Sequence, residues 1–180
     1  GVTLGPPLPT LGARGLGVSA LRLDGARVHP SSVLGGEPGR GDEQAAAALR
    51  LARLGVAATA VGLAQAAFEA ALRYSQERVT FGKPIGQHQA IQLKLADMAT
   101  GITAARLLTY HAAERLTAED GDASSRMAKL LASETALDVT FEAMRIHGGY
   151  GYTTEFPVER YYRDAAELVL TPDGNDTERL

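Results

Sequence analysis

The sequence lacks cysteine entirely, carries no excess of positive charge and contains no long hydrophobic run. Without cysteine the chain forms neither a disulfide nor a thiolate metal site, and it has no thiol nucleophile. The absence is typical of a reducing compartment, so we expect a cytoplasmic location. The formal net charge of −3 argues against a nucleic-acid partner, because such partners select a basic patch or a high pI.

No segment of the sequence predicts a leader or a membrane span. The first residues, GVTLGPPLPTLG, have neither a basic start nor an apolar stretch as long as a secretory signal needs. The longest apolar run, residues 54–68, contains Gln65 and many alanines, and it is too short to cross a bilayer. A composition of 45% hydrophobic and 22% charged residues is instead typical of a globular protein with a core.

Residues 1–41 differ from the rest of the chain because glycine and proline are dense there and β-type residues occur in short pieces. Residues 18–23 roughly alternate, and residues 26–28 follow a turn at Asp24 and Gly25. This pattern predicts one or two strands, with a hairpin between them as one arrangement. Two strands do not form an independent sheet. The segment therefore either packs on helices or is the tail of a β-domain.

From residue 42 onward the pattern is helical. Apolar side chains recur every three, four or seven residues over 42–77, from about 87 to 119, and from 122 or 124 to 147. A shorter helix follows Pro157 to about residue 170, and residues 172–175 predict a turn. The expected core side chains are Leu54, Ala58, Val61, Phe68 and Leu72, then Ile91, Leu95, Met98, Ile102, Ala105 and Leu116, then Met127, Leu130, Leu131, Leu137, Phe141 and Met144.

Long helices with short connections pack as antiparallel neighbours. We therefore predict a mainly α fold, an up-down four-helix bundle in residues 42–180 preceded by a short β remnant in residues 1–41. At ~1.5 Å per residue the first helix is about 50 Å long. So long a helix leaves apolar side surface that a small bundle does not cover, which predicts a homo-oligomer.

The sequence offers few groups for catalysis. A di-metal site in a bundle requires Glu-x-x-His pairs, whereas here His111 precedes Glu114 and Glu142 lies five residues before His147, so no metal is expected. No serine lies in a nucleophile elbow, and the glycine pairs lack the strand–turn–helix context of a dinucleotide or phosphate loop.

Residues 78–99, RVTFGKPIGQHQAIQLKLADMA, form the first candidate binding stretch. One helix ends near Arg78, and Gly82 and Pro84 turn the chain before the next helix begins. Arg78 is able to donate two hydrogen bonds to a phosphate, and Phe81 is able to stack on a purine. The same two residues equally suit a helix end and a bundle end, where they would only stabilise the fold.

Residues 145–165, RIHGGYGYTTEFPVERYYRDA, form the second stretch. Glycines at 148, 149 and 151 allow the backbone to approach something bulky, although an ordinary helix cap and loop explains them equally. Five aromatic residues gather in thirteen positions, from Tyr150 to Tyr162, of a chain with few aromatics. This density predicts a packed, buried junction.

Together the two stretches resemble the acyl-CoA dehydrogenase family. The C-terminal domain of that family carries Arg-x-x-Phe-Gly-x-Pro-Ile and His-Gln-Ala-Ile, matched here within residues 78–91. It also carries Ile-x-Gly-Gly-x-Gly, Pro-Val-Glu-Arg and Arg-Asp-Ala, matched at 146–151, 157–160 and 163–165. Residues 10–36 are similar to the last strands of the middle β-domain of the family, so the resemblance covers nearly the whole chain.

The resemblance implies an FAD-dependent flavoprotein of fatty acid metabolism that dehydrogenates an acyl-CoA. It implies a dimer or homotetramer with FAD at its subunit interfaces, and an electron-transfer flavoprotein as a partner. The flavin would take a hydride from the β-carbon of the acyl thioester while a carboxylate removes the α-proton. The residues implied at the cofactor are Arg78 at the pyrophosphate of a neighbouring subunit, Phe81 and Gln89 at the adenosine end, Gly148 and Gly149 at the dinucleotide, and Arg145, where the family commonly has glutamine.

The sequence departs from the family pattern at the general base. The family often places a glutamate in Tyr-Glu-Gly-Thr after Arg-Asp-Ala, whereas residues 171–175 here read TPDGN. The base then falls on Pro172 or, with a shift of one residue, on Asp173. Other members carry a glutamate directly before the arginine that matches Arg53, where this chain has Ala52. Asp173 is therefore the candidate general base, with a structural turn aspartate as the alternative.

The family's N-terminal helical domain and the first part of its β-domain have no counterpart in this sequence. We therefore expect the chain to be the C-terminal FAD-binding and oligomerisation domain of an acyl-CoA dehydrogenase, incomplete on its own. A non-catalytic partner or oligomerisation subunit, and a flavin oxidase or monooxygenase of the same superfamily, are the alternatives. The sequence leaves the acyl chain length open.

Overall fold

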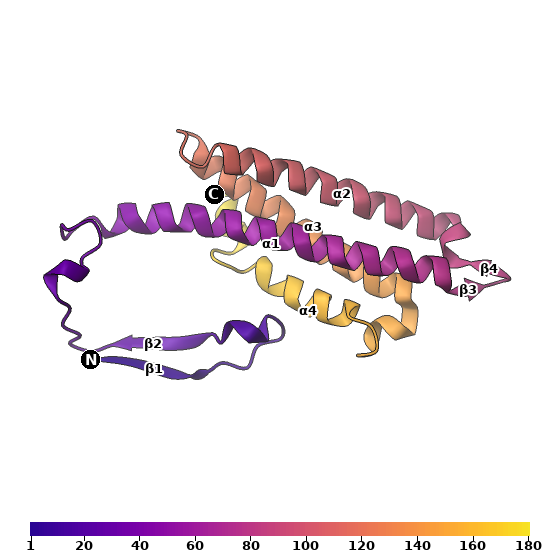
Figure 1. The fold of residues 1–180 in the computed structure, drawn as a ribbon, viewed down its shortest axis with the longest axis horizontal. Coiled ribbons are helices and arrows are strands. Elements are labelled where there is room, and N and C mark those ends of the chain that lie inside the picture. The colour runs from indigo at the N-terminus through magenta and orange to yellow at the C-terminus, as the bar shows by residue number, and fades with distance from the viewer.

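A computed structural model describes all residues, 1–180, and shows a long helical bundle beside a small β segment (Figure 1). The bundle consists of α1 (Gly41–Glu77), α2 (Gln89–Glu114), α3 (Gly121–His147) and α4 (Val158–Leu168). The predicted mainly α fold with four bundle helices is confirmed. A short helix, α5 (Asn175–Glu178), follows where the sequence predicted only a turn.

Local chemistry sets the ends of the long helices. Asp42 and Glu43 lie in the first turn of α1, where their charges complement the positive end of the helix dipole. α1 stops at Glu77 because the next residue is extended and leads into the hairpin of β3 (Val79–Thr80) and β4 (Lys83–Pro84). α3 stops before Gly148, whose φ of 60° suits glycine better than other residues.

The β segment differs from the sequence prediction. β2 (Ser19–Leu23) lies within the predicted strand, but it pairs antiparallel with β1 (Val2–Pro7), with Val2 opposite Leu23. Residues 26–28 form no strand, so the hairpin expected at Asp24 and Gly25 is wrong. The sequence pattern missed β1 because a glycine and two prolines interrupt its alternation, and proline is tolerated on an edge strand such as this one.

The loop that joins β1 to β2 fastens the β segment to α4. Asp164 Oδ1 accepts a hydrogen bond from Ala13 N at 2.7 Å, and Arg163 Nη1 donates to Leu11 O at 3.0 Å. A Cβ on Gly12 would stand 2.1 Å from the carbonyl oxygen of Arg163, so only glycine fits this approach. The Arg-Asp-Ala motif therefore holds the β segment against the bundle.

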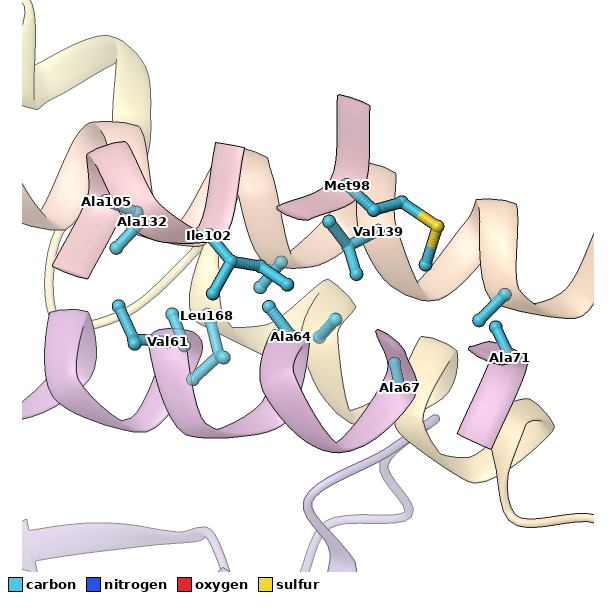
Figure 2. Packing of buried hydrophobic residues seen from close by; sticks show 14 of the residues in the cluster. Val61, Ala64, Ala67, Ala71, Met98, Ile102, Ala105, Ala132, Val139 and Leu168 are labelled. Atoms are coloured by element: carbon cyan, nitrogen blue, oxygen red, sulfur yellow. The ribbon is translucent and has the colours of Figure 1, made fainter. Parts of the chain in front are cut away.

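The core is lined mainly by alanine rather than by large apolar residues (Figure 2). α1 packs most extensively on α3, and small side chains let the two helices approach closely. Val61, Met98, Ile102 and Ala105 are buried as predicted. The other buried apolar residues of the three long helices are Ala57, Ala60, Ala64, Ala67, Ala71, Ala112, Ala128, Ala132, Ala136, Val139, Ala143 and Ile146.

Several of the predicted core residues are exposed. Ala58 lies on the outer side of α1, and Met127, Leu131 and Phe141 of α3 are 50%, 38% and 47% exposed. These predictions were wrong because they followed the largest apolar side chains of α3, whereas its buried face carries alanine, serine and threonine. The large side chains of α3 consequently form part of an apolar surface on the outside of the bundle.

By length and composition alone, α1 could cross a membrane. The same helix supplies six of the buried apolar residues that pack against its neighbours, namely Ala57, Ala60, Val61, Ala64, Ala67 and Ala71. The core helix of a bundle meets the same two criteria, so this feature is weak support for a membrane span.

Neighbouring alanines of α1 provide a direct test of the core. Ala57 is completely buried and Ala58 is exposed. Replacing Ala57 with leucine overpacks the contact between helices, and we expect a loss of about 1–3 kcal/mol in the free energy of unfolding. Chemical denaturation measures this loss. The matched variant Ala58→Leu should change stability by less than about 0.5 kcal/mol, and an equal loss in both variants would contradict the observed packing.

Candidate functional site

One end of the bundle brings the two candidate stretches together. α1 and α3 run in the same direction, so their C-terminal ends meet (Figure 1). Arg78, directly after α1, and Gly148 and Gly149, directly after α3, line one cavity of about 440 Å³. The other residues that line it are Tyr74, Thr80, Ile85, Ile146, His147, Tyr150 and Thr153.

Arg78 contributes a cation that no carboxylate neutralises. It takes part in none of the salt bridges of the chain. Its guanidinium carbon lies 5.9 Å from the centre of the Tyr150 ring. Its backbone is fixed by hydrogen bonds to Tyr74 O and from Ile85 N. A guanidinium placed over an aromatic ring keeps its N–H donors available for an anion.

Gly148 and Gly149 leave open space beside their backbone. A Cβ on either residue would meet no atom of the chain within 4 Å. Gly151 is different, because its Cβ would stand 2.3 Å from Met144 O. Packing within this chain therefore requires glycine at 151, while the two open glycines have room for something bulky. The N–H of Gly148 donates to Arg145 O, so what these glycines offer a ligand is open space beside the backbone, next to the cation of Arg78.

An aromatic cluster supports the cavity. The ring of His147 stacks on Tyr74 with 4.3 Å between centroids, and Phe156 lies 5.1 Å from His147. Burial lowers the pKa of His147, and a hydrogen bond to Ala143 O at 2.8 Å opposes this only in part. The predicted buried aromatic junction forms only in part: Phe156 and Tyr150 belong to this cluster, but Tyr150 is 44% exposed and Tyr152 is 86% exposed.

Phe81, Gln89 and Arg145 do not line this cavity. Phe81 stands at the tip of the β3–β4 hairpin, 97% exposed and with a φ of 51°. Gln89 is the exposed first residue of α2, and Arg145 pairs with Glu142 on the outer side of α3. An exposed phenylalanine in the left-handed region is uncommon, which points to a contact outside the chain.

A buried charge cluster occupies the other end of the bundle. The side chain of Arg53 is 4% exposed and donates through all three of its nitrogens. It reaches Glu178 Oε1 at 2.9 Å, Asp122 Oδ1 at 3.0 Å and Asp173 Oδ2 at 2.9 Å. Arg126 bridges Asp122 and Glu178, and its hydrogen bond is the main cause that lowers the pKa of Asp122. The cluster joins α1, α3 and the segment after α4.

Lys129 of α3 holds the segment after α4 in place, through the backbone of Asp173 and through Asn175, the first residue of α5. Its completely buried ammonium donates to Asp173 O and to Asn175 Oδ1, both at 2.6 Å. Burial lowers the pKa of Lys129, although nearby carboxylates oppose the shift. No sequence pattern predicted this burial, because a single lysine on an amphipathic helix is typical of a solvent-exposed position.

Asp173, the candidate base, therefore lies in the charge cluster. Its Oδ2 accepts from Arg53, and it lines neither the cavity at Arg78 nor a further cavity between the β segment and the bundle. A charge-assisted hydrogen bond of this kind holds the carboxylate in place on Arg53. The alternative of a structural turn aspartate thus gains support from the geometry.

The second cavity, of about 330 Å³, lies between the β segment and the bundle. It is lined by Ala13, Gly15, Leu16, Thr59, Leu63, Asp164, Glu167 and Leu168. Asp164 already accepts from Ala13 N, whereas Glu167 Oε1 accepts only from the hydroxyl of Thr171, at 2.6 Å. No sequence signal marked Glu167, because it lies outside every matched motif.

Comparison with known proteins identifies the family of the chain. Residues 39–176 match the family described as "Acyl-CoA dehydrogenase, C-terminal domain". The whole chain is 39% identical to a 3-(aryl)acrylate reductase of Clostridium sporogenes and 41% identical to the mitochondrial short-chain specific acyl-CoA dehydrogenase of Homo sapiens. It covers 48% and 44% of those two proteins, and so spans about half the length of the curated relatives it matches.

Solved structures agree with this assignment. Butyryl-CoA dehydrogenase from Megasphaera elsdenii superposes with a TM-score of 0.93 at 39% identity, over 99% of this chain and 47% of that one. The chain belongs to the acyl-CoA dehydrogenase family and contains its C-terminal helical domain. The resemblance drawn from the sequence motifs is confirmed.

The charge cluster makes a prediction about stability. Replacing Arg53 with methionine leaves three carboxylates without their common partner, and we expect a loss of about 3–5 kcal/mol in the free energy of unfolding. The exposed pair of Arg40 and Glu43 serves as the control. There, Arg40→Met should cost at most about 1 kcal/mol in the same denaturation experiment. Similar losses in the two variants would show that the cluster is not energetically special.

The burial of His147 predicts a loss of stability in acid. Because burial lowers its pKa in the folded state, the unfolded chain binds the proton first, at about pH 6.5. The stabilisation is complete above that pH and is lost as the pH falls below it. We expect His147→Leu to flatten the fall in the free energy of unfolding below about pH 6.5. The exposed His111→Leu variant should keep the slope of the unmodified protein.

Proposed function

We propose that this chain is the C-terminal FAD-binding and oligomerisation half of a flavoprotein that dehydrogenates an acyl thioester between its α and β carbons. The cavity that unites Arg78 with the open backbone of Gly148 and Gly149 carries this proposal. The family assignment supports it, because the chain has the C-terminal domain of acyl-CoA dehydrogenases. An acyl-CoA substrate, an electron-transfer flavoprotein as partner and a cytoplasmic location belong to the same proposal.

The residues of the cavity fit the phosphates of a dinucleotide. A guanidinium without a carboxylate partner, the open space beside two glycines and the hydroxyl of Thr80 are all suited to phosphate oxygens. A volume of about 440 Å³ accommodates part of such a ligand. Arg78, Gly148 and Gly149 would hold the pyrophosphate region, and FAD when bound would supply a two-electron oxidant.

The exposed residues expected at the cofactor support a site shared between subunits. Phe81 and Gln89 project from the same end of the bundle but outside the cavity, and Arg145 lies on the outer side of α3. Within one chain they have no common cavity with Arg78. We infer that they meet the cofactor, at its adenosine end for Phe81 and Gln89, only when a second subunit is docked.

The outer face of the bundle supports oligomerisation. Large apolar side chains remain exposed on α2 and α3, and exposed apolar area of this kind marks an interaction surface. They are Leu93, Leu107, Tyr110, Met127, Leu131 and Phe141, between 38% and 63% exposed. A dimer or tetramer of this chain within the full protein would bury them.

The chain's own residues would bind and orient the cofactor and remove the α-proton. Asp173 is the base that the sequence pattern proposes, and its ion pair with Arg53 opposes that role. The reaction requires a carboxylate beside the acyl chain, and cavity walls that exclude water from it.

The cofactor site is tested at Arg78. In the full-length protein, Arg78→Ala removes a charge-assisted hydrogen-bond donor, and we expect FAD to bind about 10- to 100-fold more weakly. Titration of the apoprotein with FAD, followed by flavin fluorescence, measures the change. Arg73 is an exposed arginine within the last two turns of α1 and lies outside the cavity. Unchanged affinity in Arg78→Ala, or an equal loss in Arg73→Ala, would refute the proposed site.

A further inference from the structure

We propose that Glu167, and not Asp173, is the carboxylate of this chain that accepts the α-proton of the acyl thioester. The inference rests on the proposed function, because it assigns one step of that reaction. It comes from the cavity between the β segment and the bundle. Glu167 lines this cavity, and its carboxylate forms no salt bridge within the chain.

Asp173 is occupied by structural contacts. Its Oδ2 accepts from Arg53 at 2.9 Å, and its backbone oxygen accepts from the buried Lys129 at 2.6 Å. The same arginine also binds Glu178 and Asp122, so moving Asp173 toward a substrate would break a shared cluster. These contacts give Asp173 a role in holding the segment after α4.

Glu167 accepts no hydrogen bond from an arginine or a lysine. It lies on the last turn of α4 and forms no salt bridge, and its Oε1 accepts from the Thr171 hydroxyl at 2.6 Å. The second oxygen, Oε2, has no hydrogen-bond partner in the chain and is free to take a proton. The Thr171 contact fixes the direction of the carboxylate without neutralising its charge, which is what a general base needs.

The surroundings of Glu167 suit an acyl chain. Leu16, Leu63 and Leu168 supply apolar walls from three different elements, and Thr59 adds one hydroxyl. The only other ionisable group that lines the cavity is Asp164, whose Oδ1 holds the β segment through Ala13 N. Apolar walls favour binding of a hydrocarbon chain. A glutamate also reaches one methylene further than an aspartate.

The step balances with the oxidant of the proposed function. The α C–H bond breaks, and its proton moves to Glu167 Oε2. The electron pair of that bond becomes the second bond between the α and β carbons. The β-hydrogen would leave with its own electron pair, as a hydride, and FAD when bound would supply the two-electron acceptor, so the thioester would lose two electrons and two hydrogens.

Proton removal can be measured without the redox step. In a 3-thia-acyl-CoA, sulfur replaces the β-carbon, so no hydride can leave, yet the α-hydrogens still exchange with deuterium oxide. We expect Glu167→Gln in the full-length holoprotein to slow this exchange by about 10²- to 10⁴-fold. Mass spectrometry of the thioester gives the rate, and FAD affinity and thermal unfolding show that each variant is folded and loaded.

Three further variants sharpen the test. Glu155→Gln is the same substitution at an exposed glutamate outside the cavity, and its exchange rate should match the unmodified protein. Asp173→Asn should lower stability through the charge cluster while keeping exchange at temperatures where it is folded. Glu167→Asp keeps a carboxylate and should exchange faster than Glu167→Gln, which separates loss of the base from misfolding.

Two results would overturn the assignment. Exchange in folded Glu167→Gln at the rate of Glu155→Gln would show that Glu167 is not the base. Loss of exchange in folded, FAD-loaded Asp173→Asn would return the role to Asp173. Failure of the unmodified full-length protein to bind FAD would instead refute the proposed function, and the assignment of the base with it.

Discussion

The close packing of α1 on α3 is the contact on which the rest of the structure depends. Alanine at successive buried positions of both helices allows their backbones to approach (Figure 2). Because the two helices run in the same direction, this one contact determines what lies at both ends of the bundle. At one end it places Arg78 beside Gly148 and Gly149, and at the other it places Arg53 beside Asp122.

The two ends have different chemistry. The end at Arg78 leaves a cation without a carboxylate partner beside glycines with open space around them, as a binding site for an anionic group would. The other end satisfies its charges internally, through Arg53, Arg126 and Lys129. Asp173 is one of the carboxylates satisfied in this way, through its hydrogen bond with Arg53. The carboxylate of Glu167, which forms no salt bridge, lies between these ends, against the β segment.

Much of the fold was predictable because its signals are local. Helix ends at Glu77 and His147 follow from the residues around them, and the motif at residues 78–91 identified the family. The pairing of β1 with β2 and the burial of Ala128 instead of Met127 were not predictable. Strand pairing depends on a partner distant in sequence, and the buried face of an alanine-rich helix depends on how closely its neighbour approaches.

For the candidate site, the sequence by itself determined which residue types are present and their order, and so the family, the cation Arg78 and the two open glycines. Only the tertiary structure decided which of them share a cavity, and that Phe81, Gln89 and Arg145 lie outside it. It also decided that Asp173 is bound to Arg53, 120 positions away in the chain, while Glu167 faces a cavity. The physical reason is that a carboxylate's availability depends on its neighbours in space, and a linear motif does not contain them.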